Sequence, residues 1–201
     1  MGEVEPVHSM YQLPNYVPRN LDVAPKAKVI NFIGQAGAGK SSHAASLFAH
    51  MKVQGYNVEL ISEYAKAMVW RESTGMLNNQ VYILAKQYEQ QERLRDKVDY
   101  IITDSPLLLN YYYNRGKVKS LEPLVYELWD SFDNIMFYVE RTKPYVALGR
   151  YQTENEADLD GIAIRRMIDA SGEPYRVIKS LPDTSSETVL NMIHNPFINA
   201  L

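Results

Sequence analysis

The stretch VINFIGQAGAGKSSHAASLFAHMKVQG, residues 29–55, decides how this chain is expected to fold. It opens with the apolar run 29–33, which is interrupted only by Asn31. A run without polar alternation is typical of a parallel strand that is buried on both faces. Beyond a glycine-rich turn, apolar residues recur at helical spacing over 40–54, and Gly55 suits the left-handed position after a helix. The stretch therefore predicts a buried strand, a tight loop and a helix in direct succession.

The loop between this strand and this helix reads GQAGAGKS, residues 34–41, and matches the pattern G-x-x-x-x-G-K-[S/T] without a gap. Its glycines allow the backbone to curl with its N–H groups inward, and the helix adds the positive end of its dipole. In such a loop Lys40 can reach the β- and γ-phosphates of a nucleotide, and the Ser41 hydroxyl can bind Mg²⁺. We therefore expect ATP and Mg²⁺ as ligands, in preference to a chance glycine-rich turn. The candidate nucleotide-binding residues are Gly34, Gln35, Ala36, Gly37, Ala38, Gly39, Lys40, Ser41 and Ser42.

The rest of the chain alternates short apolar runs with helical patterns. Further strands are expected over 57–61, 100–103, 135–139 and 175–178, and helices over 63–71, 78–98, 107–114, 121–132, 153–171 and 184–194. This alternation predicts a three-layer α/β fold, with a five-stranded parallel sheet between helices. Residues 1–25 contain four prolines and are expected to form an extended arm, so that 26–201 make up one domain.

Composition narrows the classes of function. The chain has 201 residues, 46% of them hydrophobic, no cysteine and a net charge of −3. Without cysteine, disulfides, thiolate metal sites and cysteine nucleophiles are excluded. The acidic balance argues against a nucleic-acid-binding face, although it leaves a local basic groove open. No apolar run is long enough for a membrane span and the first residues lack a secretory pattern, so we expect a cytoplasmic protein that does not associate with membranes.

Asp104 follows the strand predicted over 100–103, at the edge where parallel sheets bind ligands. A carboxylate in this position can hold Mg²⁺ directly or through water, together with Ser41. The alternative is that Asp104 caps the next helix, but Ser105 can fill that role.

Glu63 follows the strand predicted over 57–61, at the same edge. It can accept the proton of an attacking hydroxyl or bind the hydroxyls of an acceptor. The alternative is a solvated acid in the first turn of a helix.

Arginines follow the fourth predicted strand and predict a lid over the phosphates. Arg141 and Arg150 bracket this segment, and Gly149 is a candidate hinge. Guanidinium groups can neutralise the charge that builds up on a transferring phosphoryl group. Arg165 or Arg166, in the next predicted helix, can swing in with the lid. The alternative is a solvated surface stretch.

These segments occur in the same order as in P-loop nucleoside and nucleotide kinases, which the chain resembles. They are GQAGAGKS at 34–41, ISEYA at 61–65, TDSP at 103–106 and the arginines at 141 and 150. More closely, over roughly residues 28–195, the chain looks like small phage-encoded AAA-labelled ATPase/kinase proteins. Those in turn resemble the kinase half of bifunctional nicotinamide-riboside kinases.

The resemblance implies a sheet of order 2-3-1-4-5, ATP with Mg²⁺ as the phosphoryl donor, and a location in the host cytoplasm if a phage encodes the chain. It assigns catalytic roles to Lys40, Glu63, Asp104, Arg141 and Arg150, and magnesium binding to Ser41 and Asp104. Deoxynucleoside kinases commonly have Asp-Arg-Ser after strand three, where this chain has Asp104-Ser105-Pro106. The missing arginine speaks against that acceptor class.

Three functions follow from these features. The first is a kinase for a nucleoside, nucleotide or related metabolite, whose base could stack on Tyr64, Tyr111–Tyr113 or Tyr151 if these rings are not used in core packing. The second is a DNA-directed kinase that phosphorylates a hydroxymethylated base, which needs a wider and more basic groove. The third is an NTPase switch or motor, which commonly needs a further domain. A homo-oligomer is compatible with each of them.

Overall fold

The structure is a computed structural model, and it describes residues 27–62, 79–147 and 153–195. Its centre is a parallel sheet of five strands in the order β2-β3-β1-β4-β5. The strands are β1 (Lys28–Ile33), β2 (Val58–Ile61), β3 (Tyr100–Thr103), β4 (Asp133–Glu140) and β5 (Tyr175–Lys179). The predicted fold class is confirmed, including the strand order that the resemblance implied.

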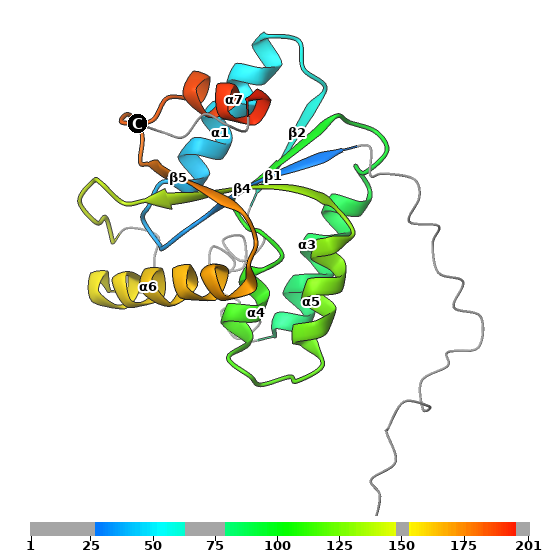
Figure 1. Ribbon diagram of the computed structural model, residues 1–201, viewed down its shortest axis with the longest axis vertical. Helices are drawn as coiled ribbons and strands as arrows, with labels where there is room; N and C mark the ends of the chain where they lie inside the picture. Colours follow the sequence, from blue (N-terminus) through cyan, green and yellow to red (C-terminus); the bar gives the residue numbers. More distant parts are fainter. Residues whose placement is uncertain (1–26, 63–78, 148–152, 196–201) are drawn as a thin grey trace, which may run out of the picture.

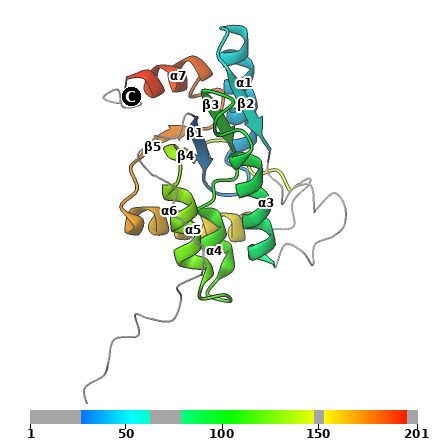
Figure 2. The same cartoon turned by 90° about the vertical axis from the view of Figure 1, so that its right-hand side faces the viewer.

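Helices cover both faces of the sheet (Figure 1). On one face lie α1 (Lys40–Val53) and α7 (Ser186–His194); on the other lie α3 (Gln80–Glu92), α4 (Leu109–Asn114), α5 (Leu121–Asp130) and α6 (Glu154–Ser171). Figure 2 shows the same three layers from the side. The carboxyl ends of the parallel strands share one edge, where α1 and α6 both begin, so this edge is where the chain can assemble a site.

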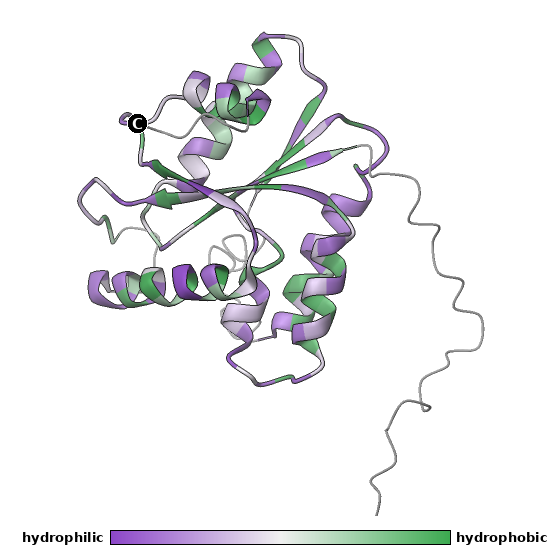
Figure 3. Cartoon of the chain, in the orientation of Figure 1, coloured by the Kyte–Doolittle hydropathy of each residue, from purple (hydrophilic) through white to green (hydrophobic). Residues whose placement is uncertain are grey.

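Each face of the sheet has its own core, because successive residues of a buried strand point to opposite faces. In β1, Val29 and Ile33 pack towards α3 to α6, whereas Ile30 and Phe32 pack towards α1 and α7. Figure 3 shows the apolar residues concentrated along the strands. A sheet buried on both faces explains why its strands read as nearly continuous apolar runs.

Several predicted helices differ in their limits. The helix predicted over 107–114 begins only at Leu109, after turns, because Ser105 does not cap it and instead accepts a hydrogen bond from Gln87. The helix predicted over 78–98 ends at Glu92 as α3 and continues as turns. The arm predicted over 1–25 and the helix over 63–71 lie outside the described residues. Among the described residues, no helix has the length and apolarity to cross a membrane.

Candidate functional site

The loop between β1 and α1 curls against the end of β4. Gly34 has a φ of 147°, and a Cβ there would lie 2.7 Å from the carbonyl oxygen of Val139, so any larger residue would collide with the β4 backbone. Gly39 is the N-cap of α1 with a left-handed φ of 96°. A glycine N-cap has no side chain to take the first amides of the helix, and the first turn contains no acid. These amides and the helix dipole favour an anion at this position.

Lys40 lies over the same loop. Its Nζ donates to the carbonyl oxygens of Gly34 at 2.9 Å and Gln35 at 3.0 Å. These contacts hold the ammonium group at the loop, where the sequence predicted a phosphate-binding lysine. Ser41 and Ser42, in the first turn of α1, are exposed, so their hydroxyls are accessible to a ligand.

Ser180, directly after β5, braces the loop from behind. It is fully buried, and its Oγ lies 2.9 Å from the carbonyl oxygens of both Ala38 and Glu140. The same Oγ accepts a hydrogen bond from the Thr142 backbone N–H at 3.2 Å. One side chain therefore joins the phosphate-binding loop to the end of β4 and to the segment that follows it.

His43, in the first turns of α1, fixes that helix to β5. It is 1% exposed, its Nε2 lies 2.9 Å from the Lys179 carbonyl oxygen, and its ring stacks on Phe32. Burial lowers its pKa below the ordinary value, because the protonated imidazolium would lose its hydration; the hydrogen bond to Lys179 opposes this effect only in part. His43 is therefore a neutral structural residue that keeps the start of α1 in place.

Asp104 follows β3, as predicted, and is 4% exposed. Its Oδ1 is buried and has no hydrogen-bond partner among the described residues. A buried carboxylate oxygen without a partner is costly unless a ligand binds it. Carboxylate and hydroxyl oxygens are the ligands that Mg²⁺ prefers, so Asp104 and Ser41 fit a magnesium ion.

The turn that carries Asp104 is held by buried polar contacts. Ser105 donates its backbone N–H to Thr103 Oγ1, and its own Oγ accepts from Gln87 of α3. Gln87 Oε1 in turn accepts from the side chain of Asn110 in α4. These contacts fix the turn to two helices.

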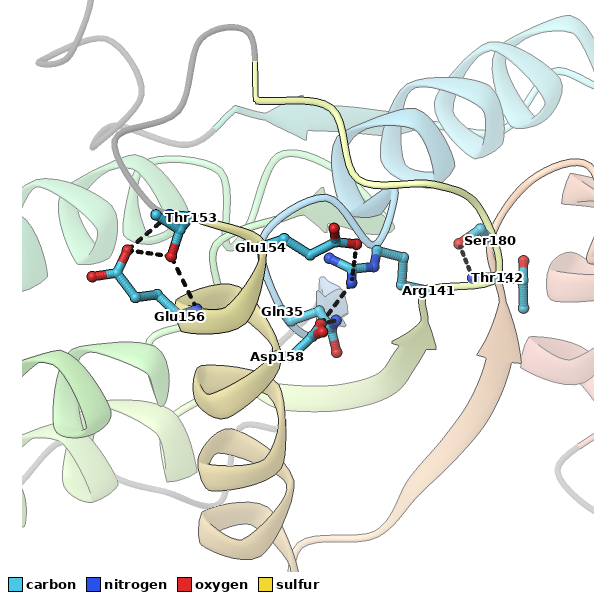
Figure 4. Close-up of polar contacts among 8 residues, drawn as sticks. All are labelled: Gln35, Arg141, Thr142, Thr153, Glu154, Glu156, Asp158 and Ser180. Atoms are coloured by element: carbon cyan, nitrogen blue, oxygen red, sulfur yellow. Dashed lines mark hydrogen bonds and ion pairs between the residues drawn. The ribbon is translucent and has the colours of Figure 1, made fainter.

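Arg141 follows β4, as predicted, but acids of α6 hold it (Figure 4). Its Nη2 lies 2.6 Å from Asp158 Oδ1 and 3.1 Å from Glu154 Oε1. The side chain is 10% exposed, and Nη1 is buried without a hydrogen-bond partner among the described residues. Its Cδ lies 3.7 Å from the position of a Cβ on Gly37, so the guanidinium is anchored beside the phosphate-binding loop.

Two further residues of this segment lie against the loop and were not singled out from the sequence. The Lys143 Nζ is 3.4 Å from the position of a Cβ on Gly39, at the start of α1. Tyr145 Cδ2 is 3.1 Å from the corresponding position on Gly37, and the Arg141 guanidinium lies 5.3 Å from the centre of the Tyr145 ring. Their place after β4 was the only signal in the sequence, because a lysine or a tyrosine in a polar segment is otherwise unremarkable.

The remaining candidates are distributed as follows. Arg165 pairs with Glu140 at 3.1 Å and lies over the Tyr138 ring. An open pocket of about 300 Å³ lies between β4 and α6. It is lined by Arg165, Glu140 and Tyr138 together with Gln35, Arg141, Gly161 and Ile162. Arg166 is exposed. Tyr111–Tyr113 pack partly buried against the core, which favours the packing alternative for these rings. Glu63, Tyr64, Gly149, Arg150 and Tyr151 lie outside the described residues.

A parallel sheet of order 2-3-1-4-5, whose first strand leads through GQAGAGKS into a helix, defines a P-loop NTPase. A family model described as an AAA domain matches residues 29–183, which is most of the chain. The chain belongs to this family of AAA domains, and its P-loop is a nucleoside-triphosphate-binding site.

Solved structures show the same fold. The crystal structure of the NadR protein in complex with NR matches with a TM-score of 0.64 and 14% identity, over 88% of this chain and 54% of that chain. The chain thus spans about half of the length of that protein, and at this identity the likeness concerns the fold alone. A search of curated protein sequences finds no match.

Proposed function

We propose that this protein is an ATP- and Mg²⁺-dependent phosphotransferase that moves the γ-phosphoryl group to a small acceptor: a nucleoside, a nucleotide or a related metabolite. The observation that carries the proposal is Arg141, whose buried Nη1 lies beside the phosphate-binding loop and has no hydrogen-bond partner in the part of the chain that the structure describes. P-loop NTPases obtain such an arginine either from the same chain or from a partner. Arg141 belongs to the same chain, which suits a kinase that works without a partner.

In the proposed reaction an acceptor hydroxyl oxygen attacks the γ-phosphorus, and the bond from phosphorus to the β–γ bridging oxygen breaks. ADP leaves, and Glu63 accepts the hydroxyl proton. Lys40 and the amides of residues 34–42 bind the phosphates of the donor. Arg141 and Arg150 offset the charge on the transferring group. Ser41 and Asp104 would hold a magnesium ion, which would neutralise charge on the phosphates.

A riboside is the first acceptor to test. The NadR structure holds NR, and the two proteins share the fold. The assay combines γ-labelled ATP and Mg²⁺ with nicotinamide riboside, nucleosides, nucleoside monophosphates and hydroxymethylated DNA. Label in one small acceptor supports the proposal, label in DNA supports a DNA-directed kinase, and release of phosphate alone supports an NTPase switch.

Lys40→Ala tests the role of the loop. We expect phosphoryl transfer to fall at least a hundredfold, because the ammonium group at the loop supplies electrostatic stabilisation in a preorganised site. Lys52→Ala is the matched control, since Lys52 belongs to the same helix but pairs with Glu59 on its exposed side. Full activity of Lys40→Ala would contradict the proposal.

A further inference from the structure

The geometry points to Asp158 as a positioning residue for phosphoryl transfer, which acts by orienting Arg141 and is itself held in place by Gln35 of the phosphate-binding loop. This inference rests on the proposed function. It adds Asp158 of α6 to the site and gives a role to the side chain of Gln35, which belongs to the loop.

The contacts rank Asp158 above Glu154 as the partner of Arg141. Arg141 Nη2 lies 2.6 Å from Asp158 Oδ1 but 3.1 Å from Glu154 Oε1, and the two acid side chains are 47% and 59% exposed. Both acids engage the same nitrogen, Nη2. Because the guanidinium is planar, fixing Nη2 also fixes the direction of Nη1, which has no hydrogen-bond partner within residues 27–62, 79–147 and 153–195.

Gln35 joins Asp158 to the loop. Its Nε2 donates to Asp158 Oδ1 at 2.8 Å, so this oxygen is shared by the amide and the guanidinium (Figure 4). Gln35 reaches α6 because residue 161 is a glycine: a Cβ there would approach Gln35 Oε1 closely and lie 3.0 Å from Gln35 Cβ and Cδ. The loop and the arginine are therefore linked through one carboxylate oxygen.

Such a link matters more for orientation than for stability. Ion pairs with half-exposed acids contribute little to folding, typically less than about 1 kcal/mol. A misplacement of about 1 Å at a reacting centre, in contrast, can reduce a rate roughly a hundredfold. Loss of Asp158 should therefore impair turnover while the fold persists.

Asp158→Asn is the direct test, because it keeps the shape and removes the charge. We expect kcat to fall roughly tenfold, KM for ATP to change less than about threefold and the unfolding midpoint to stay near the wild-type value. Nitrogen-15 NMR of the Arg141 guanidinium, recorded without any turnover, should show hindered rotation in the wild type and faster rotation in Asp158→Asn, in which only the longer contact to Glu154 keeps its full charge. Leu159→Ala is the control, since Leu159 is the exposed neighbour on the same helix.

Gly161→Ala tests the link without touching a charge. The added methyl group should displace Gln35 and reproduce the kcat defect of Gln35→Ala, and the double variant should be no worse than either single one. Likewise, Asp158→Asn should add nothing in an Arg141→Met background, whereas an independent role would give additive losses.

The outcomes separate this inference from the proposed function. If the wild-type protein transfers no phosphoryl group, the proposed function fails. Two other results overturn only the inference about Asp158, provided that the wild type transfers the phosphoryl group. In the first, Asp158→Asn keeps full kcat; in the second, the kcat losses of Asp158→Asn and Arg141→Met add up in the double variant. An unchanged, hindered Arg141 signal in Asp158→Asn would overturn it as well.

Discussion

Replacing Ser180 by alanine should loosen the phosphate-binding loop from behind. The hydroxyl has one proton, so it donates to the carbonyl oxygen of Ala38 or of Glu140 at any moment, while it accepts from the Thr142 N–H. The substitution thus removes two hydrogen bonds, each worth about 1 kcal/mol, at a fully buried position. We expect a loss of about 2 kcal/mol in the free energy of unfolding, which lowers the midpoint of thermal unfolding by about 4–8 °C in a chain of this size.

Urea unfolding followed by circular dichroism measures this loss, and calorimetry with ATP and Mg²⁺ measures the binding site. Affinity for ATP should fall together with stability, because the loop loses its connection to the end of β4. Ser171→Ala is the matched control: among the described residues, the Ser171 Oγ bonds to the Ile168 carbonyl in α6 and to the Glu173 N–H just beyond that helix. If both serine variants unfold at the wild-type midpoint, or with equal losses, the bracing role of Ser180 is wrong.

Three further predictions concern the same region. Burial holds the pKa of His43 below its ordinary 6.5, so the unfolded chain binds a proton before the folded chain does as the pH falls. The stability that depends on neutral His43 is therefore complete above pH 6.5 and decreases below it, by up to about 1.4 kcal/mol per pH unit. His43→Gln should flatten this part of a plot of urea midpoint against pH. Asp104→Asn should reduce turnover about a hundredfold and raise the Mg²⁺ concentration needed for half-maximal rate, while ATP binding without Mg²⁺, measured by calorimetry, stays unchanged. Lys143→Gln should weaken ADP and ATP binding roughly three- to tenfold at low salt and less at high salt, because Lys143 Nζ lies beside Gly39. Lys119→Gln is the control and should have no effect, since Lys119 is exposed.

The sequence predicted the sheet and the loop because both depend on local patterns. Buried strands read as apolar runs, and GQAGAGKS is a continuous motif in a required context. The start of α6 is local as well: the helix was predicted from residue 153, and there Thr153 and Glu156 form a capping box with two reciprocal hydrogen bonds. Asp104 was placed correctly because a short strand ends directly before it.

The partners of Arg141 could not be predicted in this way. The sequence placed an arginine at the end of β4, but Asp158 contacts it only because α6 packs beside that strand end. Gln35 lies 123 positions from Asp158 in the chain, so no local pattern links the two. Gly161 lies inside the helix predicted over 153–171 and was not singled out from the sequence, whereas the structure shows that it makes room for Gln35. Contacts of this kind depend on how α6 docks on the loop, and a single sequence does not encode that as a local pattern.

The two charged atoms that the described residues leave buried and unsatisfied are Asp104 Oδ1 and Arg141 Nη1, a negative group after β3 and a positive group after β4, the two strands that flank β1. Each such atom costs a folded protein roughly 1–3 kcal/mol, so a fold selected for stability alone would pair or remove it. Here both stand beside the loop that binds a triphosphate, where a cation and a phosphate oxygen would satisfy them. Arg141 could have turned both of its terminal nitrogens to the acids of α6, yet only Nη2 does so. On the proposed function, the acids hold Arg141 by Nη2 and leave Nη1 to bind the nucleotide, and the cost in stability is offset when the substrate binds.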